Sequence, residues 1–204
     1  MVALTVFAAQ AAQAETENFD KQQAGAMPAG WQAGVTGRGT ARWDVRQDAS
    51  APSAPNVLRQ FGVGAFPWIV RSGTSVEDGF VEVKFKALEG KEDRAGGVIW
   101  RWKNGDSYYV ARANALEDNV SLYYVEGGRR ITLRYVDAPV PSNTWHRLRV
   151  EFSGKKISVA LNGKTYIEFE DTHISGAGAV GLWTKADSVT VFDDFSYGSG
   201  PAQR

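Results

Sequence analysis

The chain of 204 residues contains no cysteine and only two histidines, His146 and His173. The absence of cysteine excludes disulfide bonds, thiolate metal ligands and cysteine nucleophiles. Two histidines are too few for a histidine-rich metal centre, and neither accompanies a Gly-x-Ser-x-Gly nucleophile motif. Catalysis by a cysteine or by a Ser-His-Asp triad is therefore not expected.

The chain also has no excess of positive or negative charge, because Lys and Arg total 23 and Asp and Glu total 23. No sustained basic stripe marks a surface for nucleic acid or for anionic lipid. No apolar run approaches the roughly 20 residues that a membrane-spanning helix needs. We therefore expect no nucleic-acid partner and no transmembrane span. We also expect a monomer.

The N-terminal stretch "VALTVFAAQAAQA" is a short apolar run that ends in small residues. Ala12-Gln13-Ala14 fits the cleavage site of an export signal, although no Lys or Arg precedes the run. The pattern predicts a signal peptide over residues 1–14, truncated at its start; the alternative is a disordered alanine-rich tail. We expect a single domain over residues 15–198 and a disordered tail over residues 199–204.

Short segments of alternating apolar and polar residues recur after this stretch, separated by Gly, Asn, Asp and Pro. In "GFVEVKFKAL", Val81, Val83 and Phe85 share one face, and "HRLRVEF" repeats the pattern. Asn162-Gly163 is a strong hairpin signal. The chain is predicted to be all-β, with roughly a dozen strands in a two-sheet antiparallel sandwich.

The aromatic-rich strands in the middle of the chain suggest a ligand face. If Val98, Trp100 and Trp102 point inward, the alternation leaves Arg101 outward. The same reasoning for neighbouring strands predicts an outward set of Arg101, Tyr108, Arg112, Asn114, Tyr123, Trp183 and Lys185. Aromatic rings that stack on a pyranose and polar groups that bind its hydroxyls suit a carbohydrate ligand. The alternative is an ordinary sheet surface covered by aromatic and basic side chains.

Candidate acids and bases are few. Glu117 lies at a turn beside Asp118 and Asn119, where it could supply an acid or base at the rim of the predicted face, or where the three residues could simply form the turn. Glu168 and Glu170 alternate on one strand, as a retaining glycosidase requires. They are also explained as the solvated face of an amphipathic strand.

Several motifs together resemble a known family. They are Tyr-Tyr, Arg-Ala-Asn, Gly-Arg-Arg, Trp-His, Leu-Asn-Gly-Lys and Gly-Leu-Trp-Thr-Lys-Ala-Asp-Ser, within the segments that begin "GGVIWRWKNGD" and "VPSNTWHRLRV". In this order they resemble the bacterial 3-keto-disaccharide hydrolase domain family and the wider laminin-G-like, concanavalin-A-like jelly rolls. The resemblance implies a jelly-roll sandwich with a concave, carbohydrate-facing surface, exported by a bacterium.

The resemblance also implies an activity on sugars that are oxidised at carbon 3. Such chemistry needs a base, for which Glu117 or Asp187 is the candidate, and an electrophile, for which Arg112 or Lys185 is the candidate. No cofactor is required. The Glu-x-Asp-x-x-Glu motif of related glycosidases is missing, so classical glycosidase activity is not expected. The other hypotheses are a non-catalytic glycan-binding or adhesion module and a structural envelope domain.

Two adjacent carboxylates near the C-terminus pose a separate question. In "SVTVFDDFSY", either strand phase points Asp193 or Asp194 toward an apolar face unless a bulge shifts the phase. A buried carboxylate persists only with a partner. Because similar jelly rolls often hold calcium near their joined termini, the resemblance suggests a structural Ca²⁺ site formed by Asp20 with Asp193 or Asp194.

Overall fold

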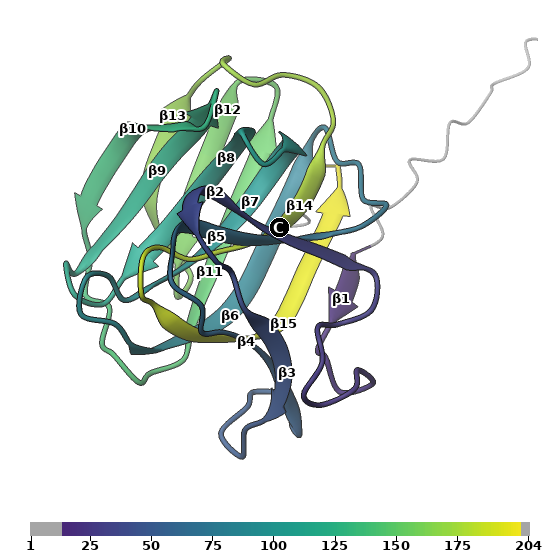
Figure 1. Cartoon of the computed structure of the whole chain (residues 1–204). Coiled ribbons are helices and arrows are strands. Elements are labelled where there is room, and N and C mark those ends of the chain that lie inside the picture. Colours follow the sequence, from purple (N-terminus) through teal and green to yellow (C-terminus); the bar gives the residue numbers. More distant parts are fainter. Residues whose placement is uncertain (1–13, 201–204) are drawn as a thin grey trace, which may run out of the picture.

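The computed structural model describes residues 14–200, which form fifteen β-strands (Figure 1). They pair into two antiparallel sheets, called sheet A and sheet B here. Sheet A contains β3 (Trp43–Gln47), β4 (Asn56–Gln60), β6 (Gly79–Glu89), β11 (His146–Ser153), β12 (Lys156–Leu161), β13 (Lys164–Glu170), β15 (Val189–Ser199) and the short β1 (Glu15–Glu17). Sheet B contains β2 (Trp31–Gly39), β5 (Gly64–Arg71), β7 (Ala95–Asn104), β8 (Ser107–Asn114), β9 (Asn119–Glu126), β10 (Arg129–Asp137) and β14 (Ala179–Trp183).

Strands distant in the sequence are neighbours in both sheets. Sheet A has the order β13-β12-β11-β6-β15-β4-β3, with β1 paired to β15, and sheet B has the order β10-β9-β8-β7-β14-β5-β2. The predicted all-β, two-sheet antiparallel sandwich is therefore confirmed. Within residues 14–200 no helix is long and apolar enough to cross a membrane.

The predicted termini fall almost entirely outside the described residues. The signal peptide expected over residues 1–14 has only its last residue within them, and residues 201–204 of the expected tail also lie outside. Strand β15 continues through Ser199, so the sheet includes the first residue that was assigned to the tail.

The main core lies between the sheets and follows the predicted alternation. Val81, Val83 and Phe85 of β6 have no exposed surface, and Leu148 and Val150 of β11 lie opposite Val83 and Val81 in the register. Alternate positions of a strand face the same side, so these residues bury the inner face of β6 and β11. Val98 and Trp100 contribute to the same core from sheet B.

The hairpin predicted after β12 is present. Asn162 and Gly163 both have positive φ, at 52° and 83°, and connect β12 to β13. A two-residue turn with both φ values positive matches the right-handed twist of the strands, which explains the Asn-Gly pair.

A bulge in β7 changes the predicted phase of two side chains. The pairing of β7 with β8 shifts between Trp100 and Asn104, and Arg101 has a φ of 48°. An irregularity of this kind turns the following side chains to the opposite face. Trp102 therefore packs on the outer face of sheet B rather than in the main core.

The guanidinium of Arg101 points away from the predicted ligand face. It donates to the carbonyl oxygens of Ile174 at 3.0 Å and Gly154 at 2.8 Å, and lies 5.8 Å from the ring of Phe152, a residue of the main core. The prediction that Arg101 belongs to the ligand face is wrong, because the bulge reverses the alternation on which that prediction rested.

Sheet B is strongly curled. In Figure 1, β2 and β5 cross in front of β7 and β14. The hydroxyl oxygens of Thr36 in β2 and Tyr108 in β8 are 2.8 Å apart, although three strands of the sheet separate them. The curl thus brings the β2 edge over the outer face of its own sheet.

Candidate functional site

The outer face of sheet B carries a second hydrophobic cluster, called the outer cluster here. Its buried members are Trp68, Val70, Ile99, Tyr108, Val110, Tyr123, Val125 and Trp183, with Phe66, Trp102 and Ala179 packed against them. The prediction that Tyr108, Tyr123 and Trp183 share the outward face of sheet B is confirmed in position. Their exposed fractions are only 0%, 3% and 0%, so these rings do not form an open surface for stacking on a sugar.

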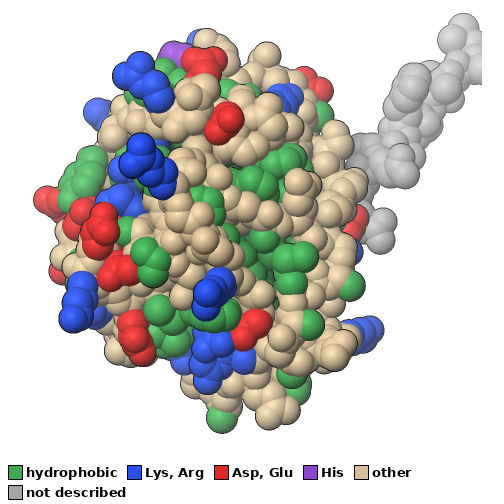
Figure 2. Space-filling model, in the orientation of Figure 1, with side chains coloured by type: hydrophobic (Ala, Val, Ile, Leu, Met, Phe, Trp, Pro, Cys, Tyr) green, Lys and Arg blue, Asp and Glu red, His purple; other side chains and the backbone are tan. Residues whose placement is uncertain are grey.

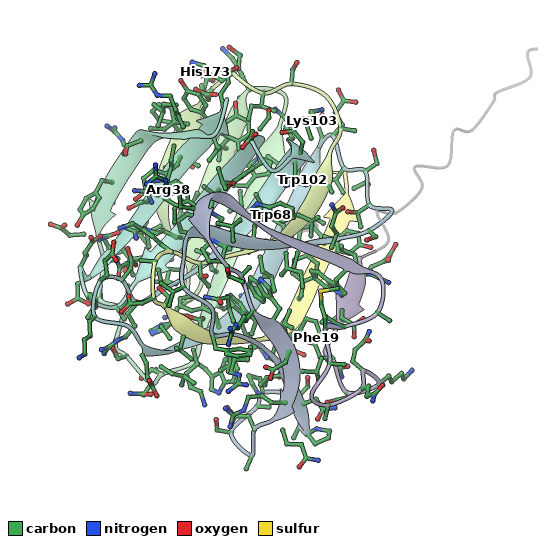
Figure 3. All side chains as sticks on the ribbon, in the orientation of Figure 1. Phe19, Arg38, Trp68, Trp102, Lys103 and His173 are labelled. Atoms are coloured by element: carbon green, nitrogen blue, oxygen red, sulfur yellow. The ribbon has the colours of Figure 1, made fainter. Side chains whose placement is uncertain are left out.

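The curl of the sheet covers the outer cluster. The ring of Phe66 stacks on Trp183 with centroids 5.7 Å apart and an interplanar angle of 18°. Trp68 and Trp102 lie together, with centroids 5.2 Å apart (Figure 3). Burial in this layer raises the pKa of the Tyr108 phenol to about 12.

Charged side chains gather beside the outer cluster and form what we call the charged network: Asp93, Arg112, Glu117 and Lys185. Asp93 Oδ2 accepts from Arg112 Nη1 at 2.8 Å and from Lys185 Nζ at 2.7 Å. Glu117 Oε2 accepts from Arg112 Nη2 at 2.6 Å. The network is therefore a continuous chain from Glu117 through Arg112 and Asp93 to Lys185.

Four different segments supply the charged network. Arg112 comes from β8, Glu117 from the turn before β9, Asp93 from the loop before β7, and Lys185 from the segment after β14. Arg112 and Asp93 are buried, whereas the side chains of Lys185 and Glu117 are 24% and 41% exposed. The two ends of the network thus reach solvent while its centre does not. Figure 2 shows charged side chains of both signs on the side of the molecule where Figure 1 places β9 and β10.

Groups within and beside the charged network shift the pKa values of Glu117 and Arg112. Desolvation raises the pKa of Glu117, but the hydrogen bond from Asn119 and the charge of Arg112 outweigh it and lower the pKa. Desolvation opposes the charge of Arg112, yet Asp93 and Glu117 raise its pKa overall. At neutral pH the site therefore presents a carboxylate that can accept a proton, next to cations.

Asp187 has a different role from the one expected. Its carboxylate accepts from the backbone N–H groups of Lys91 at 2.7 Å and of Glu92 and Asp93 at 3.0 Å. Desolvation raises its pKa, but these three donors lower it overall. The side chain thus fixes the loop that presents Asp93. Its hydrogen bonds leave little capacity for proton transfer, so they do not support a role as the base.

Two amides lie beside the charged network. Asn119 donates to Glu117 Oε2 at 2.9 Å and to the hydroxyl of Tyr135 at 2.8 Å. Asn114 accepts from the backbone N–H of Leu116 at 2.9 Å, and its Nδ2 is buried without a partner among the described residues. Asn114 therefore shapes the turn before Glu117, behind the surface that a ligand can reach.

Two residues of this site, Asp93 and Arg130, were not predicted from the sequence. Asp93 lies in a loop, where alternation gives no information about the direction of a side chain. Arg130 lies in β10 at the sheet edge, with its guanidinium 4.2 Å from the ring centroid of Tyr123. The Gly-Arg-Arg motif contained Arg130, but no strand pattern indicated what the side chain would contact.

The three carboxylates of the predicted calcium site are bound by protein donors. Asp193 is buried and accepts from the N–H of Ser53 at 2.7 Å. Asp194 pairs with Lys84 at 2.8 Å, and Asp20 accepts from the N–H of Asn56 at 3.0 Å. Within residues 14–200 no group of three or more potential metal-binding side chains occurs. The contacts therefore do not supply the expected ligand set, and calcium binding stays a prediction.

The bulge anticipated near this Asp pair is present. The pairing of β15 with β6 shifts between Asp193 and Ser196, and Asp194 has a φ of 47°. The bulge lets Phe192 and Phe195 both face the main core, while Asp193 lies opposite Lys84 on the outer face of sheet A and Asp194 pairs with Lys84.

Comparison with known proteins places this architecture in a family. Residues 16–196 match the family model of the 3-keto-alpha-glucoside-1,2-lyase-like domain. The chain belongs to this family. No curated protein sequence matches the chain.

Members of the wider fold class have been solved. The chain is similar to the carbohydrate-binding module CBM66 from Bacillus subtilis, with a TM-score of 0.66 and 21% identity over 83% of this chain and 94% of that chain. It also resembles the β-glucanase of Bacillus licheniformis, with a TM-score of 0.55 and 13% identity over 94% of this chain and 100% of that chain. For the lumenal domain of VIP36 the TM-score is 0.59, with 10% identity over 86% of this chain and 85% of that chain. These likenesses confirm the jelly-roll sandwich.

Proposed function

We propose that this family member is an exported carbohydrate-active domain that cleaves 3-keto-glycosides by elimination at the charged network. The observation that carries the proposal is the position of Glu117 and Lys185 at the two solvent-exposed ends of that network. A carboxylate and an ammonium held on one rigid frame are the two groups that the elimination needs.

The reaction has a simple balance. A ketone at carbon 3 of the sugar acidifies the C–H bond at carbon 2. The Glu117 carboxylate takes that proton, and the Lys185 ammonium stabilises the negative charge on the ketone oxygen. The bond between carbon 1 and the glycosidic oxygen then breaks, a double bond forms between carbons 1 and 2, and the departing oxygen takes the proton that Glu117 now carries, which restores the carboxylate.

The buried centre of the network positions these two groups. Arg112 binds Glu117 with one nitrogen and Asp93 with the other, so its charge is already shared between two carboxylates. Within residues 14–200, Lys185 forms an ion pair with Asp93 alone, and its side chain stays partly exposed. Lys185 is therefore the better electrophile, and Arg112 and Asp93 act as positioning residues.

The test is release of the leaving group from a synthetic 3-keto-glucoside, with the unoxidised glucoside alongside. We expect turnover of the oxidised substrate only, a loss of about 100-fold or more in kcat for Glu117→Gln, and a large loss for Lys185→Ala. Glu168→Gln removes an exposed carboxylate from sheet A and serves as the matched control. Full turnover by both network variants would refute the assignment of Glu117 and Lys185.

A non-catalytic glycan-binding or adhesion module is the second candidate. The likeness to CBM66 favours it, and so does the lowered pKa of Glu117, because a weaker base removes a carbon-bound proton more slowly. Binding of 3-keto-glucosides or of unoxidised oligosaccharides without release of the leaving group would support this module. If the protein neither binds these sugars nor releases the leaving group, the remaining hypothesis is a structural envelope domain.

Export, a monomeric state and independence from cofactors belong to the same proposal. Residues 1–14 carry the export hypothesis, so deletion of residues 2–14 should retain the protein in the cytoplasm of a bacterial host, as cell fractionation would show. We expect a monomer by light scattering and unchanged turnover after dialysis against a chelator.

A further inference from the structure

We propose that the sugar bound beside the charged network carries a carboxylate, as a hexuronic acid does, and that Arg130 binds this group. This inference rests on the proposed function, because it names the class of carbohydrate that the same site accepts.

Arg130 differs from Arg112, the buried arginine of the charged network, in its partners. Arg112 forms ion pairs with Asp93 and Glu117. Arg130 forms no ion pair with any residue in the range 14–200, and its Nη1 atom is buried without a hydrogen-bond partner there. A guanidinium has five N–H donors, and donors removed from water stabilise the protein only when they find an acceptor.

Aromatic rings hold this guanidinium in place. Its central carbon lies 4.2 Å from the centroid of Tyr123, 4.9 Å from that of Phe66 and 5.8 Å from that of Trp183. Ring faces attract the cation but accept no strong hydrogen bond. The contacts therefore fix the position of Arg130 without supplying an acceptor for its N–H groups.

The charged network and Arg130 together carry a net positive charge. Arg112, Lys185 and Arg130 carry three positive charges, whereas Asp93 and Glu117 carry two negative charges. Burial lowers the pKa of Arg130, which shows that this cation is held against a desolvation penalty. An anionic group on the ligand would compensate the excess charge, and a neutral sugar would not.

The shape of the guanidinium selects among anions. Its planar fork matches a carboxylate with two parallel hydrogen bonds, and it also binds phosphate and sulfate. The shared chemistry is an oxyanion. A carboxylate on a sugar ring is the form that places the anion next to a site already proposed to bind carbohydrate.

Calorimetric titration with a glucuronate-containing disaccharide and with its neutral glucose counterpart tests this inference. We expect the native protein to bind the acidic sugar about tenfold more tightly or better, because a hydrogen bond to a charged group contributes roughly that much. Arg130→Gln should abolish the preference, and Arg130→Lys should retain only part of it. Arg129→Gln removes an exposed positive charge from the neighbouring position of β10 and should change nothing.

Competition experiments distinguish a sugar carboxylate from a free oxyanion, and the binding results of the variants decide the inference. Inorganic sulfate and phosphate should compete only weakly; if either displaces the acidic sugar at equal concentration, the site recognises a free oxyanion and the inference is wrong. Equal binding of both disaccharides, or a preference that survives Arg130→Gln or Arg130→Lys unchanged, overturns the inference and leaves the proposed function standing. Failure of both disaccharides to bind overturns the inference, whereas turnover of 3-keto-glucosides independently decides the proposed function.

Discussion

The guanidinium of Arg130 lies 4.9 Å from the ring of Phe66, although four strands of sheet B separate β10 from β5. Neighbouring strands are about 4.8 Å apart, so a flat sheet would place β10 and β5 about 24 Å from each other. The contact therefore records a strong curl, which closes the two sides of the sheet over its own outer face. A surface that would otherwise be open becomes a second buried core.

Replacement of Phe66 by alanine should open this second core. The substitution removes the stacking on Trp183 and the ring beneath Arg130. We expect a loss of about 2 kcal/mol in the free energy of unfolding, from the lost apolar burial and the lost aromatic pair. Urea denaturation measures this loss, and Phe66→Leu should recover part of it. An unchanged midpoint for Phe66→Ala would show that the outer cluster is stable without its cover.

Alternation in the sequence was sufficient to divide the strands between faces. A period of two places Tyr109 inward and Tyr108 outward whatever the sheet packs against, and both predictions hold. Exposure is a different quantity. It depends on the curl that brings Phe66 and Arg130 together, which arises from contacts between distant strands. The prediction of an open aromatic surface failed for this reason.

Local irregularities limited the prediction of the site. The β7 bulge moved Arg101 away from the predicted face, because one shifted register reverses every later side chain on the strand. Asp93 lies in a loop, so no periodicity indicated that it would join Arg112 to Lys185. Glu117 and Lys185 were predictable, since the first follows a strand end and the second belongs to a recognisable motif.

Asp93 should be the most sensitive position of the charged network. Asp93→Asn leaves Arg112 and Lys185 without their shared counter-charge in a buried position. Breaking a buried ion pair by removing one partner costs about 3–5 kcal/mol, so we expect a loss of that size in the free energy of unfolding. The exposed pair between Glu170 and Lys155 provides the control, because Glu170→Gln should leave stability nearly unchanged. Similar losses in the two variants would contradict the importance of burial.

Stability should fall at acid pH through carboxylates with lowered pKa values, including Glu117 and Asp187. A carboxyl group whose pKa is lower in the folded state stabilises the fold above its unfolded pKa, and this contribution disappears as the pH falls through the folded pKa. The urea midpoint should therefore decline below the ordinary values of 4.5 for glutamate and 3.8 for aspartate.

The Asp187→Asn variant isolates one of these contributions. It should be less stable than the native protein at neutral pH, and the difference should shrink as the pH falls from 3.8, where the carboxyl group of the unfolded chain is protonated, through the lower pKa of the folded state, where the native carboxylate is protonated as well. Urea denaturation at several pH values measures the difference. A gap that stays constant from neutral to acid pH would mean that the three backbone donors do not act through the charge of Asp187.

Calcium binding near Asp193 can be decided by a matched pair of experiments. The calcium hypothesis predicts that a chelator lowers the unfolding temperature, that added Ca²⁺ restores it, and that Asp194→Asn removes this response. In the folded chain, protein groups already bind the two carboxylates: Ser53 donates to both Asp193 and Asp194, and Lys84 pairs with Asp194. Ser53→Ala tests directly whether these protein donors stabilise the carboxylates. If it lowers the unfolding temperature while the chelator changes nothing, protein donors hold the two carboxylates and the calcium hypothesis is wrong.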